Sequence, residues 1–268
     1  MAFVDNEDDG GLRSGFSGKI LGVLIVAAVG FAAKFLVPLL THSSSDVTPD
    51  RLRAQIEADP GNREVFGAIR ASYPAEYETF LQRFSDTANA TNDSWMLQQQ
   101  AFNFTSRLMR LHFDGLARAP STAVRDIALQ YAALFRALQD ADVRLCAQAA
   151  NTGFQAGQEL PSEAKGVIAH LGAMQITAAR QGETHPSPPR SAMSEAELAQ
   201  LLRAIEARSG SAARLLGSDR AMAAATPEQQ CQTAIALYET VSALPPDDAA
   251  KATIHLLRPS QDPAAPTS

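Results

Sequence analysis

Two cysteines are the residues of this sequence with the most specific chemistry. Cys146 and Cys231 are the only cysteines in 268 residues, and each falls on the apolar face of a segment with helical periodicity. Two core-facing cysteines in an exported domain predict a disulfide, which would close a loop of about 85 residues. Their separation does not fit the C-x-x-C spacing of redox-active pairs. The alternative is two unpaired buried thiols that pack as small apolar side chains.

Four aromatic residues at helical spacing form a second candidate site. Tyr73, Tyr77, Phe80 and Phe84 lie within the stretch SYPAEYETFLQRF, not far along the chain from an apolar N-terminal segment. One interpretation is that the four rings pack into the core of the domain. The other is that they line a groove close to a membrane and bind a partner or ligand there. The pattern alone leaves both interpretations open.

Recognisable catalytic, cofactor-binding and metal-binding motifs are absent from the sequence. It contains no G-x-S-x-G nucleophile elbow, no G-x-G-x-x-G dinucleotide loop and no H-E-x-x-H zinc motif. The histidines are isolated from one another, at His42, His112, His170, His185 and His255. We therefore assign no catalytic, cofactor-binding or metal-ligating residue and expect no cofactor.

Composition predicts a helical protein and argues against a nucleic-acid partner. The chain carries 23 Lys+Arg against 29 Asp+Glu, and this acidic balance does not favour the concentrated positive face that nucleic acids require. Ala, Leu, Arg, Gln and Glu are strong helix formers, whereas alternating runs of β-branched residues are missing. Only four of the basic residues are lysine, a bias typical of GC-rich bacterial genomes. We expect an all-α bacterial protein.

The first 40 residues predict a membrane anchor. Residues 1–18 are polar, glycine-rich and charged, which is typical of a disordered tail. Residues 19–40 follow, and the apolar run Ile20–Leu40 would be roughly 30 Å long as a helix, matching the hydrocarbon core of a bilayer. Lys34 lies near the far end, where its long side chain can reach the headgroups. The acidic n-region argues against a signal peptide cleaved near residue 33, an alternative that stays open.

The flanking charges predict the orientation of this anchor. Arg13 and Lys19 precede the apolar run, and neither Arg nor Lys occurs between Leu36 and Asp50. By the positive-inside rule the short tail is cytoplasmic and the C-terminal domain lies in the periplasm. The expected location is therefore the bacterial inner membrane, with a single pass through it.

The remaining chain is predicted to form one multi-helix domain over residues 51–257. A polar linker at residues 41–50 precedes it, and residues 258–268 form a tail expected to be disordered. Periodic apolar stripes and capping residues predict the following helices: 50–58, 63–71, 74–86, about 97–111, about 124–145, about 162–178, 195–208, 227–244 and 247–257. Three prolines and a glycine at residues 181–193 predict a mobile loop or a hinge.

These features together predict a single-pass inner-membrane protein. Its helical periplasmic domain would bind or scaffold another cell-envelope component. The alternative is a periplasmic helical enzyme or ligand-binding domain whose site is assembled from distant residues. A deep polar pocket with converging histidine or carboxylate groups would favour the alternative. An exposed apolar groove would favour partner binding.

Overall fold

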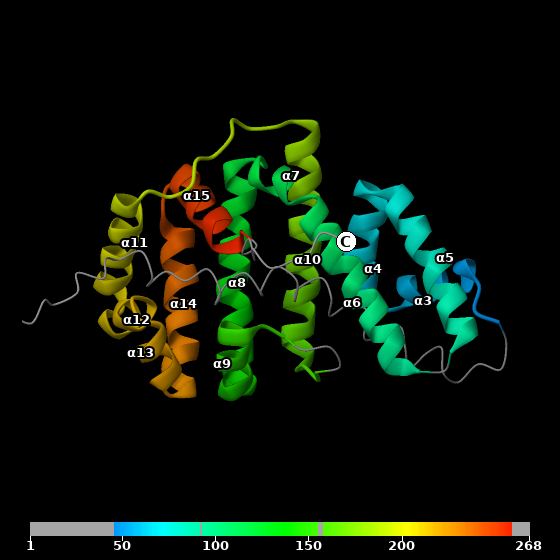
Figure 1. The fold of residues 1–268 in the computed structure, drawn as a ribbon, viewed down its shortest axis with the longest axis horizontal. Helices are drawn as coiled ribbons and strands as arrows, with labels where there is room; N and C mark the ends of the chain where they lie inside the picture. Colours follow the sequence, from blue (N-terminus) through cyan, green and yellow to red (C-terminus); the bar gives the residue numbers. More distant parts are fainter. Residues whose placement is uncertain (1–45, 92, 155–157, 259–268) are drawn as a thin grey trace, which may run out of the picture.

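The computed structural model describes residues 46–258, except residue 92 and residues 155–157. The described part is all-helical and contains no strand. Its thirteen helices carry the labels of Figure 1. They are α3 (Pro49–Ala58), α4 (Pro60–Ser72), α5 (Pro74–Ala90), α6 (Ser94–Leu111), α7 (Phe113–Ala117), α8 (Ser121–Ala141), α9 (Val143–Thr152), α10 (Ser162–Thr184), α11 (Glu195–Arg208), α12 (Gly210–Leu216), α13 (Asp219–Ala224), α14 (Pro227–Ala243) and α15 (Pro246–Leu257).

The N-terminal predictions lie outside the described residues. The tail at residues 1–18, the anchor at residues 19–40 and most of the linker precede residue 46, and nearly all of the C-terminal tail follows residue 258. Among the helices that the structure does describe, none combines the length and the apolar character needed to cross a membrane.

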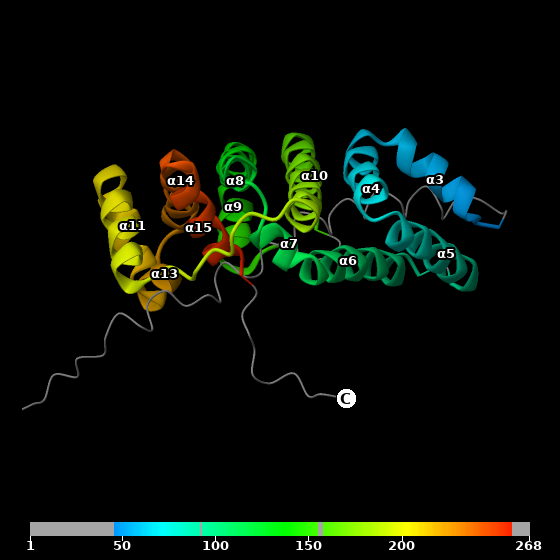
Figure 2. The same ribbon diagram turned by 90° about the horizontal axis from the view of Figure 1, so that it is seen from above.

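The helices form two layers, seen edge-on in Figure 2. One layer is a row in which α11, α14, α8, α10 and α4 lie side by side, and α15, α7, α6 and α5 belong to the other. The row does not follow chain order, because α10 packs between α4 and α8, and α14 packs against α8. A continuous hydrophobic core extends through these helices from Val47 to Leu257.

Capping residues place several helix starts where the sequence predicts them. Ser194 and Glu197 form a capping box, and α11 covers Glu195–Arg208, the predicted residues. Thr226 and Gln229 form a second capping box at the start of α14. Both boxes satisfy backbone N–H groups that the first helical turn would otherwise leave without a partner.

One predicted long helix is two helices. The stripe from Val124 to Leu145 predicts a single helix, but the chain breaks at Asp142, where the backbone is extended. The Asp142 carboxylate accepts a hydrogen bond from the Arg144 N–H at 2.8 Å and starts α9. A short polar residue that can cap a new helix therefore outweighs the uninterrupted apolar stripe.

The predicted break at residues 181–193 begins later than expected, because α10 continues to Thr184. The connection that follows is fixed by Arg190, which reaches the corner between α7 and α8. Its guanidinium donates to the carbonyl oxygens of Ala117 and Ala119, both at 2.7 Å, and to the Ser121 hydroxyl at 2.9 Å. Burial lowers the pKa of Arg190. The Arg190 side chain thus links the proline-rich connection to the corner between α7 and α8.

Two glycines allow α7 and α10 to cross with their backbones in contact. A Cβ atom on Gly182 would overlap the carbonyl oxygen of Gly115. A Cβ atom on Gly115 would lie 2.5 Å from the carbonyl oxygen of Ala179. This close crossing brings the junction of α6 and α7 against α10.

Candidate functional site

A groove of about 770 Å³ lies between α5 and α6. Phe80 from α5 and Phe104 and Leu108 from α6 form its apolar floor. The rings of Phe80 and Phe104 stack with their centroids 4.4 Å apart, which fixes the register of the two helices. Exposed apolar side chains lie at the two ends of the α6 wall, Met96 at one and Leu111 at the other. The groove therefore has an apolar floor and apolar ends, with polar side chains along its walls.

The groove exists because α6 has few neighbours. This helix packs mainly against α5 and α7 in the layer away from the row (Figure 2). The predicted stripe of α6 is buried at Leu97, Ala101 and Leu108, whereas Leu111 is 65% exposed. Burial of Leu111, expected from the periodicity, is therefore wrong, because Leu111 lies on the groove side of the last turn of α6, whereas Leu108 and Met109 in the same turn are buried.

Two arginines give the groove a positive character. Arg83 on α5 and Arg107 on α6 are exposed and line it, and the half-buried acid Glu76 lines it as well. Among the described residues, neither guanidinium makes a hydrogen bond or an ion pair. The side-chain oxygen of Gln100 is buried in the wall and has no hydrogen-bond partner within the described part of the chain. These groups are available to a molecule that binds in the groove.

The four candidate aromatic residues, Tyr73, Tyr77, Phe80 and Phe84, are all buried. Tyr77 and Phe80 pack on Phe66 of α4, with ring centroids 6.5 Å and 5.2 Å away. Their packing therefore joins α5 to α4. Phe80 also forms part of the groove floor, so the aromatic stretch and the groove share this residue.

A cluster of titratable residues from distant parts of the chain surrounds His112, beside the groove. Its Nδ1 lies 2.6 Å from Oε1 of Glu183 on α10, and its Nε2 lies 4.0 Å from Oε1 of Glu76. Its ring stacks on Tyr73 with the centroids 3.8 Å apart. Burial, reinforced by the charge of Glu183, raises the pKa of Tyr73. The cluster thus joins α5, the α6–α7 junction and α10.

The geometry of this cluster supports binding and positioning better than covalent catalysis. A histidine oriented by a carboxylate can serve as a general base. Burial raises the pKa of the Tyr73 hydroxyl within the cluster, however, which disfavours its ionised, nucleophilic form. His112 is therefore best described as a residue that connects the α6–α7 junction to α5 and α10.

A second cleft of about 310 Å³ lies over α10 between α4 and α8. Glu64 and His170 line it, with 2.7 Å between Oε1 and Nδ1, and Asp126 lies in the same cleft. The Arg125 guanidinium forms an ion pair with the Asp126 carboxylate at 3.1 Å. Within the described ranges, no group of three or more His, Cys, Asp or Glu side chains is placed to hold a metal ion.

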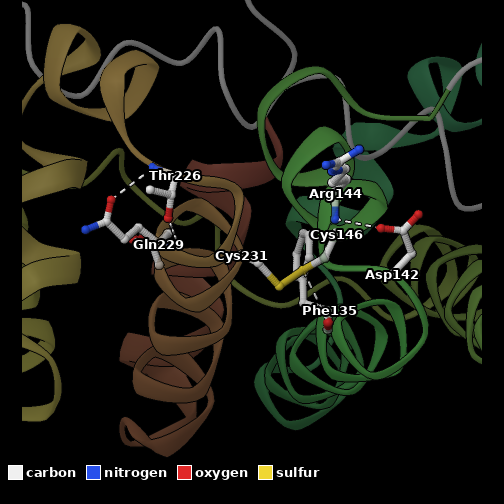
Figure 3. Close-up of a disulfide and its surroundings, with 8 residues drawn as sticks. Phe135, Asp142, Arg144, Cys146, Thr226, Gln229 and Cys231 are labelled. Atoms are coloured by element: carbon white, nitrogen blue, oxygen red, sulfur yellow. Dashed lines mark hydrogen bonds between the residues drawn. A yellow bond between two sulfur atoms is a disulfide. The ribbon is translucent and has the colours of Figure 1, made fainter.

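The two cysteines form a disulfide between α9 and α14, as the sequence predicts (Figure 3). Their Cα atoms are 5.3 Å apart, and both side chains are fully buried. Each cysteine lies near the start of a helix that has its own cap, Asp142 for α9 and Thr226 for α14. The bond therefore links two helix starts that are already held in place.

Several groove residues were not predicted as site residues. Arg83, Gln100 and Arg107 look like ordinary polar positions on two amphipathic helices. One signal was present at the start of α6, where Trp95, Met96 and Leu97 follow one another. Three consecutive apolar side chains on a helix cannot all face one core. The His112–Glu183 contact joins residues 71 positions apart, and no local pattern marks it.

No family model matches this sequence, and no curated protein and no solved structure is significantly similar to it. We therefore infer its function from the arrangement of the chain's own residues.

Proposed function

We propose that this protein is a single-pass protein of the bacterial inner membrane. In this proposal, its helical periplasmic domain binds an amphipathic helix of another envelope protein in the α5–α6 groove. The observation that carries the proposal is a groove with an apolar floor and two exposed arginines that have no hydrogen-bond or ion-pair partner among the described residues.

The dimensions and lining of the groove suit a helix. Its α6 wall extends from Met96 to Leu111, about 22 Å by helix rise, which is the length of about 15 helical residues. The floor of Phe80, Phe104 and Leu108 offers apolar contact to side chains at i, i+3, i+4 and i+7 of a bound helix. Exposed apolar surface of this kind is typical of sites that bind a partner.

The charges of the groove favour an acidic partner. Helices α5 and α6 run in opposite directions. Arg83 follows Phe80 by three residues and Arg107 follows Phe104 by three, so the two arginines lie on opposite sides of the stacked rings. The arginines therefore flank the aromatic stack about 9 Å apart along the groove. A partner helix with two acidic residues about two turns apart would place one carboxylate near each guanidinium. Charge complementarity of this kind contributes mainly specificity and association rate.

The alternative of an enzyme or a ligand-binding domain has its best support at His112. That cluster does assemble carboxylates and a histidine from distant residues, as the alternative requires. Its only hydroxyl, on Tyr73, has a raised pKa, and the larger space beside it is the apolar groove. We therefore favour partner binding.

Peptide binding tests the groove directly. The probe is a labelled helical peptide of about 15 residues with a leucine stripe at i, i+3, i+4 and i+7 and two glutamates seven residues apart. A second peptide carries lysines instead of the glutamates. The full chain, held in nanodiscs, should bind the acidic peptide about tenfold more tightly than the basic one, as measured by fluorescence anisotropy.

Charge reversal in the protein completes this test. The double substitution Arg83→Glu and Arg107→Glu should remove or invert the preference between the peptides. The matched control is Arg110→Glu, an exposed arginine on α6 that does not line the groove, and it should retain the preference. Equal affinity of the wild type for both peptides would contradict the proposal.

The membrane topology needs its own experiment. Reporter fusions joined after Leu40 should be active in the periplasm and inactive in the cytoplasm. A cytoplasmic result would remove the proposed location and the export that the predicted disulfide assumes, while leaving the peptide measurement unaffected.

A further inference from the structure

We propose that the end of the domain carrying Trp95 and Met96 rests on the surface of the lipid bilayer. This inference rests on the membrane anchor proposed above and adds a second contact with the same membrane. Two observations carry it: the place where the described chain begins, and the exposure of the only tryptophan.

The chain enters the domain next to the α5–α6 turn. The Asn89 side chain holds the backbone of Val47 through two hydrogen bonds, accepting from its N–H at 2.7 Å and donating to its carbonyl oxygen at 2.8 Å. Asn89 is in the last turn of α5, and Trp95 is in the first turn of α6. In Figure 1 the end of α5 lies near the blue start of α3, and the start of α6 follows across a short connection at the bottom of the view.

The length of chain before Val47 limits the distance to the membrane. Seven peptide steps separate Leu40, the last residue of the predicted anchor, from Val47. Even fully extended they span at most about 25 Å. Because Val47 is fixed to Asn89, the end of α5 stays close to the hydrocarbon boundary, and Trp95 follows six residues later. Such a short tether gives this end of the domain a high local concentration at the bilayer surface.

The side chains at this end suit the membrane interface. Trp95 is 62% exposed and Met96 is 46% exposed, although both are large and apolar. Tryptophan is enriched at the level of the lipid headgroups, where its ring is partly buried and its N–H remains hydrated. The nearby Asp93 carboxylate accepts hydrogen bonds from the backbone N–H groups of Trp95 and Met96. The Asp93 carboxylate therefore caps the start of α6.

This placement specifies the partner further. Met96 belongs both to the membrane-facing end and to the groove lining. One end of the groove would then open at the bilayer surface, and its Leu111 end would point away from it. The helix that binds there would be a juxtamembrane segment, continuous with a membrane span of the partner.

Fluorescence of the single tryptophan tests the contact. The full chain is reconstituted into phosphatidylcholine nanodiscs whose acyl chains carry bromine close to the headgroup. Trp95 emission should fall by at least roughly one third relative to unbrominated lipid, because an interfacial indole lies at headgroup depth. The control variant combines Trp95→Phe with Leu129→Trp. Leu129 is 55% exposed on α8, in the other layer. The emission of the tryptophan introduced at position 129 should be unchanged by bromine.

Each outcome decides the inference. Quenching at position 95 with none at position 129 supports it. If both positions are quenched alike, or neither is, while the chain remains in the nanodisc, the bilayer contact of this end is refuted and the anchor is retained. If the chain does not enter nanodiscs, the anchor fails and the inference with it. Peptide binding by the groove is a separate measurement on the reconstituted chain, and neither of the first two results changes it.

Discussion

Gly182 is a position where a single methyl group controls the packing of two helices. Added to this residue, a Cβ would overlap the backbone of α7 at Gly115 and lie 2.6 Å from the Ala119 nitrogen. Backbone cannot move aside as a flexible side chain can. Gly182→Ala should therefore destabilise the domain by about 3 kcal/mol, at the upper end of overpacking costs, as measured by urea denaturation.

Gly166, on the same helix, is the matched control. It is exposed, and a Cβ there would have no atom within 4 Å. Gly166→Ala should raise the stability by about 0.5–1 kcal/mol, because alanine loses less backbone entropy than glycine in a helix. Similar effects from both substitutions would show that α7 and α10 are not in backbone contact.

Glu197 connects the start of α11 to α15. Its carboxylate accepts a hydrogen bond from the Lys251 ammonium at 2.6 Å and further bonds from Ser194. The bond from Lys251, followed by those from Ser194, lowers the pKa of Glu197 to about 2. A glutamate in the unfolded chain titrates near about 4.3, so the unfolded state binds the proton first as the pH falls.

The stability conferred by Glu197 should therefore depend on pH. It should be fully present above about pH 4.3 and be lost as the pH falls toward about 2. The difference between the urea midpoints of wild type and Glu197→Gln should be full at about pH 6 and should shrink steadily as the pH falls from about 4.3 through about 2. Glu206→Gln, an exposed position on the same helix, should match the wild type throughout. A difference for Glu197→Gln that persists unchanged at low pH would contradict the assignment.

At the scale of elements, Arg190 makes three of the hydrogen bonds that hold the connection between α10 and α11, and the Ser187 N–H adds one to the Arg118 carbonyl oxygen. Arg190→Met should release this connection, because three hydrogen bonds from a charged donor are lost together. We expect a loss of about 2–3 kcal/mol and faster amide hydrogen exchange over residues 185–194. Arg203→Met, at an exposed position on α11, serves as the control. Unchanged exchange in Arg190→Met would mean that the connection is held by other contacts.

Helix starts were predictable because the signals for them are local. A capping box or a proline in the first turn acts within four residues, so the starts of α5, α11 and α14 follow directly from the sequence. The division between α8 and α9 did not, since the apolar stripe continues across Asp142. The short helices α7, α12 and α13 also lack a stripe long enough to be recognised.

At the scale of the whole molecule, the disulfide joins distant parts of the chain. Cys146 and Cys231 are 85 residues apart, and loss of this cross-link increases the entropy of the unfolded chain. The double substitution Cys146→Ala and Cys231→Ala should lower the free energy of unfolding by about 4 kcal/mol. Reductant should have a similar effect on the wild type and none on the double variant. Mass analysis that finds two free thiols in the purified protein would refute the bond.

The sequence by itself determined the helical class, several helix starts, the apolar N-terminal segment and the pairing of the only two cysteines. Those features depend on residue propensities, short-range periodicity and composition. The tertiary structure decided that α10 lies between α4 and α8, that α6 has an open side, and that His112 meets Glu183. Such contacts join residues far apart in the chain, and amphipathic helices with similar apolar stripes carry no local mark of which neighbour they will pack against. The groove follows from that packing, as does the position of its two arginines, which have no partner in the part of the chain that the structure describes.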